Sequence, residues 1–388
     1  MRKFRKVIFW IHLVSALFAG VIIFVMSVTG ALLAFERQTI EFAERDARYV
    51  VQPSGAERLL PQEMIERFLL LRPDAKPASL SISSSPDEAW AISLGREGTV
   101  FVDPYTGAIT GESNKAVRGA MSTLREWHRY LAMSGDQRPI GKALTGAANL
   151  IFVLLAISGL YIWLPRILTW KRVKPVIWFR GGLRGKPRNF NWHNVIGFWT
   201  SLALVVFTLT ATVMSYQWAN DLLYTLTGNE PPSSQGRSPN GTQKEERPYA
   251  YPENLNALWL SAEQQSPTWK SISLRLPIEN NSAAFTIDEG IYWNIFGRSS
   301  LTLDTTTAAV SKWDPYSQRN GGQQLRSWFR FLHTGESLGL TGQIIGLIAC
   351  IGGAFLVWTG FSLSFRRFAK WVRKRRAAAA VYVREAEI

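Results

Sequence analysis

The sequence alternates between long apolar stretches and long segments of mixed polarity. Four apolar stretches carry almost no charge, and each is long enough for the ~20-residue helix that crosses a bilayer. The apolar stretches run over residues 7–35, 143–164, 195–218 and 338–365, and they predict transmembrane helices within 1–35, 139–165, 191–218 and 338–365. The first is too long for a cleavable signal peptide and has no small-residue cleavage site, so we expect it to remain as an anchor.

Two mixed segments, at residues 36–138 and 219–337, separate these helices. Alternating apolar and polar positions in both segments predict short strands, and turn residues follow one of them at 103–107. The predicted strands cover residues 78–83, 89–94, 99–102, 271–276, 283–287, 291–295 and 300–303. A stretch at 230–248, rich in Pro, Ser, Gly and Asn, predicts an exposed loop.

The two halves of the chain repeat each other. At an offset of 181 residues, His12 aligns with His193 and Thr29 with Thr210. At an offset of 201 residues, the matches are Asp103 with Asp304, Trp127 with Trp328, Arg129 with Arg330, Gly141 with Gly342 and Gly159 with Gly360. The unit of span, module and span therefore occurs twice, related by an axis along the membrane normal. The predicted fold is an α-helical membrane protein with four transmembrane helices in a duplicated arrangement and two extracytoplasmic α+β modules.

Charge sets the expected orientation. The chain has 44 Lys and Arg against 29 Asp and Glu, a net charge of +15. The excess lies in the first six residues, the loop 166–190 and the tail 366–388, all on one side of a four-pass topology. By the positive-inside rule, both termini are then cytoplasmic in a bacterial inner membrane, and both modules are periplasmic. The expected partner of the basic segments is membrane lipid and not nucleic acid.

Four histidines carry the candidate chemistry, and all lie at the ends of predicted spans. His12 and His193 are on the cytoplasmic side, and His128 and His333 are on the other side. Ionisable residues at membrane depth are costly and usually functional. The single cysteine, Cys350, lies in the fourth span, so no disulfide within the chain and no covalent haem attachment are expected.

Two imidazoles at each face, without cysteine or carboxylate partners in the spans, fit a haem iron held by two histidines. Zinc would require three or four ligands. We predict two haem b groups, one held by His12 and His193 and one by His128 and His333. Four arginines flank the outer pair: Arg125, Arg129, Arg326 and Arg330. They would neutralise haem propionates or, alternatively, anchor the helices at the interface, just as the histidines could be ordinary interfacial packing residues.

The outer pair departs from the strict repeat. His128 aligns with Phe329, and His333 aligns with Ala132, a difference of about one helical turn. We therefore expect an outer site that does not obey two-fold symmetry.

Several segments resemble the PepSY-associated transmembrane protein family. They are HLVSALFAGVIIFVMSVTG in the first span, VDPYTGAITG at the turn, LREWHRYL before the second span and LHTGESLGLTGQ before the fourth. The second copy of the turn, LDTTTAAV, departs from the motif. Members are bacterial inner-membrane proteins of iron acquisition, similar to ferric-siderophore reductases with haem in the membrane. The resemblance covers essentially the whole chain and implies that the four histidines are haem ligands.

The resulting hypothesis is a ferric-siderophore reductase that carries electrons across the membrane. No dinucleotide-binding motif follows a predicted strand, so the electron donor would be a cytoplasmic protein or a small reductant. Two alternatives stay open: a non-enzymatic membrane-anchored periplasmic module that binds a peptide or regulates a protease, and a transporter for siderophore or iron. The lack of charged residues inside the predicted spans argues against the transporter.

Overall fold

The computed structural model describes residues 2–165, 167–231, 251–278, 281–290 and 294–386. These residues form two compact units. The first contains the described parts of 1–34, 122–219 and 332–388, and the second contains those of 35–121 and 220–331. The loop predicted at 230–248 lies almost entirely outside the described residues.

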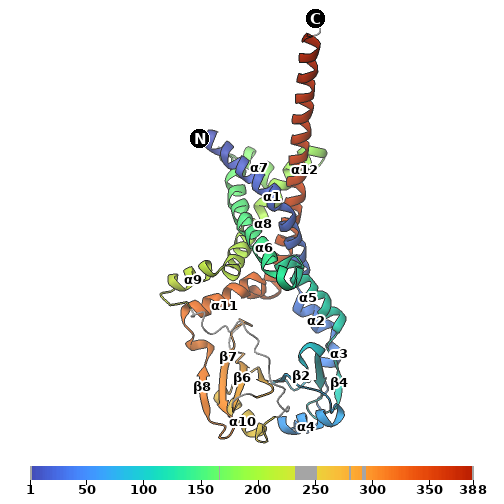
Figure 1. The fold of residues 1–388 in the computed structure, drawn as a ribbon, viewed down its shortest axis with the longest axis vertical. Coiled ribbons are helices and arrows are strands. Elements are labelled where there is room, and N and C mark those ends of the chain that lie inside the picture. The colour runs from blue at the N-terminus through green and yellow to red at the C-terminus, as the bar shows by residue number, and fades with distance from the viewer. Residues whose placement is uncertain (1, 166, 232–250, 279–280, 291–293, 387–388) are drawn as a thin grey trace. The chain divides into compact units, whose positions relative to one another are not determined.

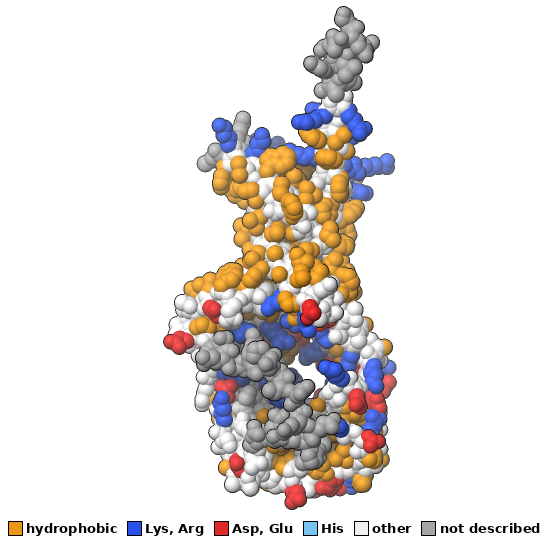
Figure 2. All heavy atoms as spheres, viewed as in Figure 1, with side chains coloured by type: hydrophobic (Ala, Val, Ile, Leu, Met, Phe, Trp, Pro, Cys, Tyr) orange, Lys and Arg blue, Asp and Glu red, His pale blue; other side chains and the backbone are white. Residues whose placement is uncertain are grey.

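The first unit is a bundle of four long helices (Figure 1). They are α1 (Arg2–Leu33), α6 (Arg138–Trp163), α8 (Gly185–Ser215) and α12 (Gly339–Ala386). Each packs against two neighbours, because α1 and α8 both contact α6 and α12. All four are long and apolar enough to cross a membrane, as the sequence predicts. Figure 2 shows apolar side chains over the visible face of this bundle and Lys and Arg at the end where the N-terminus lies. The chain is a multi-pass membrane protein.

The second unit is built on one antiparallel sheet of eight strands in the order β4-β3-β2-β1-β5-β6-β7-β8. The strands are β1 (Ser79–Ser83), β2 (Trp90–Ser93), β3 (Thr99–Val102), β4 (Ile109–Glu112), β5 (Ser271–Arg275), β6 (Ser282–Asp288), β7 (Ser299–Asp304) and β8 (Val310–Asp314). The helices are α2 (Glu36–Ala43), α3 (Arg45–Arg48), α4 (Pro61–Leu71), α10 (Leu255–Gln265), most of α9 (Gln217–Leu226) and of α11 (Gly321–His333), and the first part of α5 (Lys115–Tyr130). A short helix, α7 (Trp170–Ile177), lies in the basic loop of the first unit.

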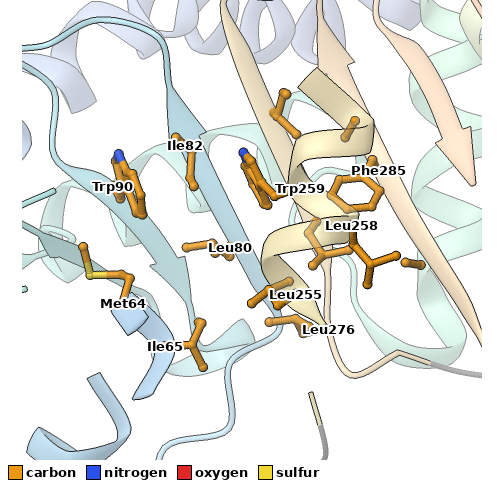
Figure 3. Close-up of a cluster of buried hydrophobic side chains, with 14 of the residues drawn as sticks. Met64, Ile65, Leu80, Ile82, Trp90, Leu255, Leu258, Trp259, Leu276 and Phe285 are labelled. Carbon is orange, nitrogen blue, oxygen red and sulfur yellow. The ribbon is translucent and has the colours of Figure 1, made fainter. Parts of the chain in front are cut away.

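One face of the sheet forms the core of this unit (Figure 3). Every second residue of the central strands points into it, including Leu80 of β1 and Leu274 of β5. The helices α4 and α10 supply the opposite side, with Ile65 and Trp259 among their buried residues. The apolar residues of the alternating pattern in the sequence therefore point into this core, and the polar residues point to the other face of the sheet.

The sequence predicts two separate modules, whereas the structure joins both segments in one sheet. Strands β1 and β5 pair along their length, from Ser79 opposite Arg275 to Ser83 opposite Ser271. In separate modules these two strands would each present an unpaired edge, and pairing removes both edges. The sequence reading also missed β4 and β8, and its predicted strand at 291–295 lies mostly outside the described residues.

Candidate functional site

The inner histidines lie on two different helices and face one cavity. His12 of α1 and His193 of α8 both line a cavity of about 360 Å³ inside the bundle. All four long helices contribute to its wall. The volume lies in the range typical of small-molecule and cofactor sites. The structure therefore places His12 and His193, which the sequence predicts to share one site, beside the same cavity.

Glycines make room beside these rings. A Cβ atom built on Gly159 would lie 3.4 Å from Cε1 of His12, and one on Gly360 would lie 3.7 Å from Cε1 of His193. A Cβ on Gly20, on the same wall, would lie only 2.7 Å from the Phe361 ring. A larger residue at Gly159 or Gly360 would fill space beside an imidazole, and one at Gly20 would collide with the Phe361 ring, so the glycines shape the cavity.

The outer histidines come together at the ends of two shorter helices. His128 lies near the end of α5, and His333 is the last residue of α11. Their ring centroids are 6.4 Å apart, and the ring planes are inclined by 55°. An imidazole nitrogen binds a transition metal at about 2 Å, so this separation leaves room for one metal ion between the rings.

Burial favours the neutral form of both outer rings. Burial, together with the neighbouring His333, lowers the pKa of His128 to about 4. Burial also lowers the pKa of His333. A neutral imidazole keeps the lone pair with which histidine binds a metal.

A hydroxyl group of a neighbouring helix meets Nδ1 of every histidine. The pairs are His12 with Ser158 at 2.9 Å, His193 with Thr359 at 2.9 Å, His128 with Thr29 at 3.0 Å and His333 with Thr210 at 3.2 Å. His12 aligns with His193 at the offset of 181 residues, and Ser158 aligns with Thr359 at the offset of 201. The outer threonines, Thr29 and Thr210, align at the offset of 181. Sequence reasoning missed these hydroxyls as partners, although Thr29 and Thr210 align in the repeat.

The other hydrogen bonds of these hydroxyls indicate which ring nitrogen carries the proton. Each hydroxyl also donates to the carbonyl four residues before it, as Thr359 does to Phe355 O at 2.7 Å and Thr29 to Val25 O at 2.7 Å. Ser158 and Thr210 do the same at 2.6 and 2.8 Å. A hydroxyl has one proton, and a hydroxyl that donates it to a carbonyl accepts from the imidazole. We assign the proton to Nδ1 in all four rings, which leaves the Nε2 lone pair for a metal.

The donor set at each site is a pair of imidazoles. Across the part of the chain that the structure describes, no group of three or more His, Cys, Asp and Glu side chains is placed to hold a metal ion. Zinc and calcium sites require more protein ligands than two. A haem iron, whose porphyrin already supplies four nitrogens, requires two, and the Nε2 atoms can supply them.

The sequence of the chain matches a known protein family. The family model described as the PepSY-associated TM region matches residues 9–367. The chain belongs to this family. The matched range includes all four histidines, their hydroxyl partners and both helical halves of this PepSY-associated protein. A search of curated proteins finds no match.

The four arginines proposed for the outer site fall in different parts of this PepSY-associated protein. Arg125 and Arg129 belong to the same unit as the histidines, whereas Arg326 and Arg330 belong to the sheet unit. The Arg129 guanidinium lies 5.2 Å from the Tyr130 ring centroid, and that of Arg330 lies 4.3 Å from the Phe296 ring centroid. Their role toward haem propionates remains a prediction.

Proposed function

We propose that the protein is a b-type transmembrane electron carrier that holds two haems and reduces ferric siderophore in the periplasm. One observation carries this proposal: four imidazoles, grouped in two pairs, each have a hydroxyl of a neighbouring helix at Nδ1, which leaves Nε2 for a metal. A hydrogen bond from Nδ1 to a fixed acceptor is the usual second contact of a metal-binding histidine. Interfacial packing residues do not require this arrangement four times.

The residues of each site fit a bis-histidine haem. His12 and His193 would bind the inner haem, and His128 and His333 would bind the outer one. When bound, haem supplies a one-electron Fe(III)/Fe(II) couple. The hydroxyls hold the rings in one orientation, and the apolar wall of the inner cavity excludes water from the metal ligands.

The proposed direction of electron flow follows from charge and from the repeat. The basic loop and both termini would lie in the cytoplasm, where a protein or a small reductant would supply electrons. The sheet unit would lie in the periplasm and receive the ferric siderophore. We infer that the chain arose by duplication, since each half contributes one inner and one outer histidine with matching hydroxyls. Reduction would release the metal because the hard oxygen donors of siderophores hold Fe(II) less well than Fe(III).

The absorption spectrum of the purified protein is the first test. We expect about two haems per chain, a low-spin spectrum, and reoxidation of the reduced protein by ferric siderophore. His12→Ala and His193→Ala should each remove the same inner haem and retain the outer one. His333→Ala is the matched control and should remove the outer haem alone.

Two results would count against the proposal. Protein expressed with abundant haem and purified without colour would favour a binding or regulatory module. A full complement of haem in either inner-site variant would show that the histidine assignment is wrong.

A further inference from the structure

The described charged side chains that line the inner cavity are all positive. Among the described residues that line it, the charged side chains are Lys186 and Arg367, and both are cations. The rest of the lining is apolar or small and polar, apart from the two histidines. The cavity thus combines a long apolar wall, a pair of metal-binding nitrogens and two positive charges.

The two cations lie at one level of the bundle. Lys186 precedes His193 by seven residues on α8, and Arg367 follows Gly360 by seven residues on α12. Gly360 is the residue whose added Cβ would lie 3.7 Å from the His193 ring. Seven residues are about two helical turns, or ~10 Å. Lys186 therefore lies on the same face of α8 as His193, and Arg367 lies on the same face of α12 as Gly360. Each cation is two turns closer to the end of the bundle that carries the chain termini.

The position of Arg367 is fixed by aromatic rings. Its guanidinium carbon lies 4.9 Å from the Phe9 ring centroid and 4.8 Å from that of Trp10. Cation–π contacts of this kind hold a guanidinium beside an apolar wall. Other basic side chains near this end have different contacts: Arg5 donates to the carbonyls of Ile162 and Leu164.

We propose that Lys186 and Arg367 bind the two propionate carboxylates of the inner haem and so fix its direction in the cavity. This inference rests on the proposed function. A porphyrin is apolar except at its iron and at the one edge that carries both acids, and the cavity presents complementary groups in the same order. Arginine can bind a carboxylate with two parallel hydrogen bonds, whereas lysine acts as a point charge. The acidic edge therefore faces the end of the bundle that carries the chain termini.

The same cations could instead bind the phosphate of an anionic lipid, and the experiment separates the two. In a His333→Ala background, which retains only the inner pair, haem-free protein is titrated with haem and with haem dimethyl ester. The ester lacks both acids. We expect the parent protein to prefer haem at least tenfold, and the Lys186→Gln, Arg367→Gln double variant to lose this preference. Lys171→Gln, which changes a cation of the same loop outside the cavity lining, is the control and should keep it.

A second readout uses protein loaded with haem in the cell. Removing positive charge near the iron disfavours the reduced form, so the double variant should show a lower midpoint potential for the inner centre than the Lys171→Gln control. Equal affinities of the parent for haem and its ester would overturn the inference. So would a double variant that keeps both preference and potential while losing bound anionic lipid, because the cations would then serve the lipid. A parent protein that binds no haem at all would instead overturn the proposed function.

Discussion

The first and second halves of the chain hold their histidines by the same contacts but position the helices that carry them differently. The inner histidines, at His12 and His193, are 181 residues apart, as are the outer hydroxyls of Thr29 and Thr210. The outer histidines are 205 residues apart, four more than the 201 that separates the spans that follow them. Both outer rings nevertheless reach equivalent hydroxyls. The hydroxyl at Nδ1 thus occupies the equivalent position in both halves, whereas the histidine lies at a different position in the helix that carries it.

The connections after α5 and α11 account for this difference of about one turn. The first helix ends at Tyr130, and Leu131 and Ala132 then adopt left-handed backbone conformations with φ of 54° and 57°. The second helix continues to His333, and the left-handed residue is Gly335, with φ of 77°. The first half therefore places two residues other than glycine in the left-handed region, at a cost in backbone strain.

The beginnings of the two helices are also held differently. Both start behind an asparagine cap, because Asn114 accepts from Val117 N at 3.0 Å and Asn320 accepts from Gln323 N at 2.9 Å. Near the start of α5, the buried carboxylate of Glu44 is paired with Arg118 and Arg48. Near the start of α11, the ion pair of Arg319 with Asp314 is partly exposed, and the buried contact is apolar.

In the second half, the ring of Tyr224 takes the place of the ion pairs. Tyr224 is buried, and a Cβ on Gly322 of α11 would collide with its ring. A charged anchor depends on pH and on both partners, whereas an apolar anchor depends on shape. The two halves should therefore respond differently to acid and to single substitutions.

Glu44→Gln should produce the largest effect on stability. Burial alone would raise the pKa of Glu44, but the hydrogen bonds and charges of Arg118 and Arg48 outweigh it and hold the pKa below its usual value. Removing one partner of a buried ion pair costs about 3 kcal/mol. We expect thermal unfolding of the purified protein to show this loss, and the outer centre, whose His128 lies on α5, to weaken before the inner one.

The stability that Glu44 contributes should depend on pH. A carboxyl with a depressed pKa contributes stability above its unfolded-state pKa and loses it as the pH falls through the folded value. The parent protein should therefore lose more stability than Glu44→Gln on acidification below pH ~4.5. Glu63→Gln removes an exposed ion pair with Arg67 and should cost less than about 1 kcal/mol. Equal losses in Glu44→Gln and Glu63→Gln would remove the distinction between the two anchors.

Removing single hydroxyls tests what the halves share. Thr359→Val should affect only the inner centre and Thr210→Val only the outer one, each lowering the affinity for its haem about 10-fold to 100-fold. Loss of the acceptor makes the imidazole less basic and stabilises Fe(III) less, so the midpoint potential of that centre should rise. Serine at the same positions keeps the hydroxyl and should restore both properties. A valine variant with unchanged potential would contradict the assigned role of the hydroxyl.

Much of this architecture could be predicted from the sequence, but not its polar contacts. The spans follow from hydropathy, and the grouping of histidines follows from their placement at span ends. The hydroxyl partners could not be found in this way, because Ser158 and Thr359 are small polar residues in apolar helices, where they resemble packing residues. Pairing of β1 with β5 joins segments almost 200 residues apart and depends on the edges that each would otherwise expose. The strands β4 and β8 are short and polar, so they lack a clear alternation.

The smallest predicted effect concerns a turn that looks lost in the second half. Asp103 Oδ1 accepts from Tyr105 N at 2.7 Å, and Asp304 Oδ1 accepts from Thr306 N at 2.9 Å, so both turns form despite the divergent sequence. The left-handed position is occupied by Gly107 in the first turn, with φ of 77°, and by Ala308 in the second, with φ of 54°.

A side chain at a left-handed position costs about 1 kcal/mol, and glycine relieves that cost. We therefore expect Ala308→Gly to stabilise the protein by less than about 1 kcal/mol, because the added freedom of the unfolded chain offsets part of the gain, and to raise the melting temperature by at most about 2 °C. Gly107→Ala should destabilise it by more, because the added Cβ would also lie 2.8 Å from Cδ of Arg67. Ala309→Gly, next along the chain at an ordinary φ, should lower stability, since glycine there only adds freedom to the unfolded chain. A loss of stability in Ala308→Gly equal to that in Ala309→Gly would show that the second turn carries no strain and that the two turns differ only in sequence.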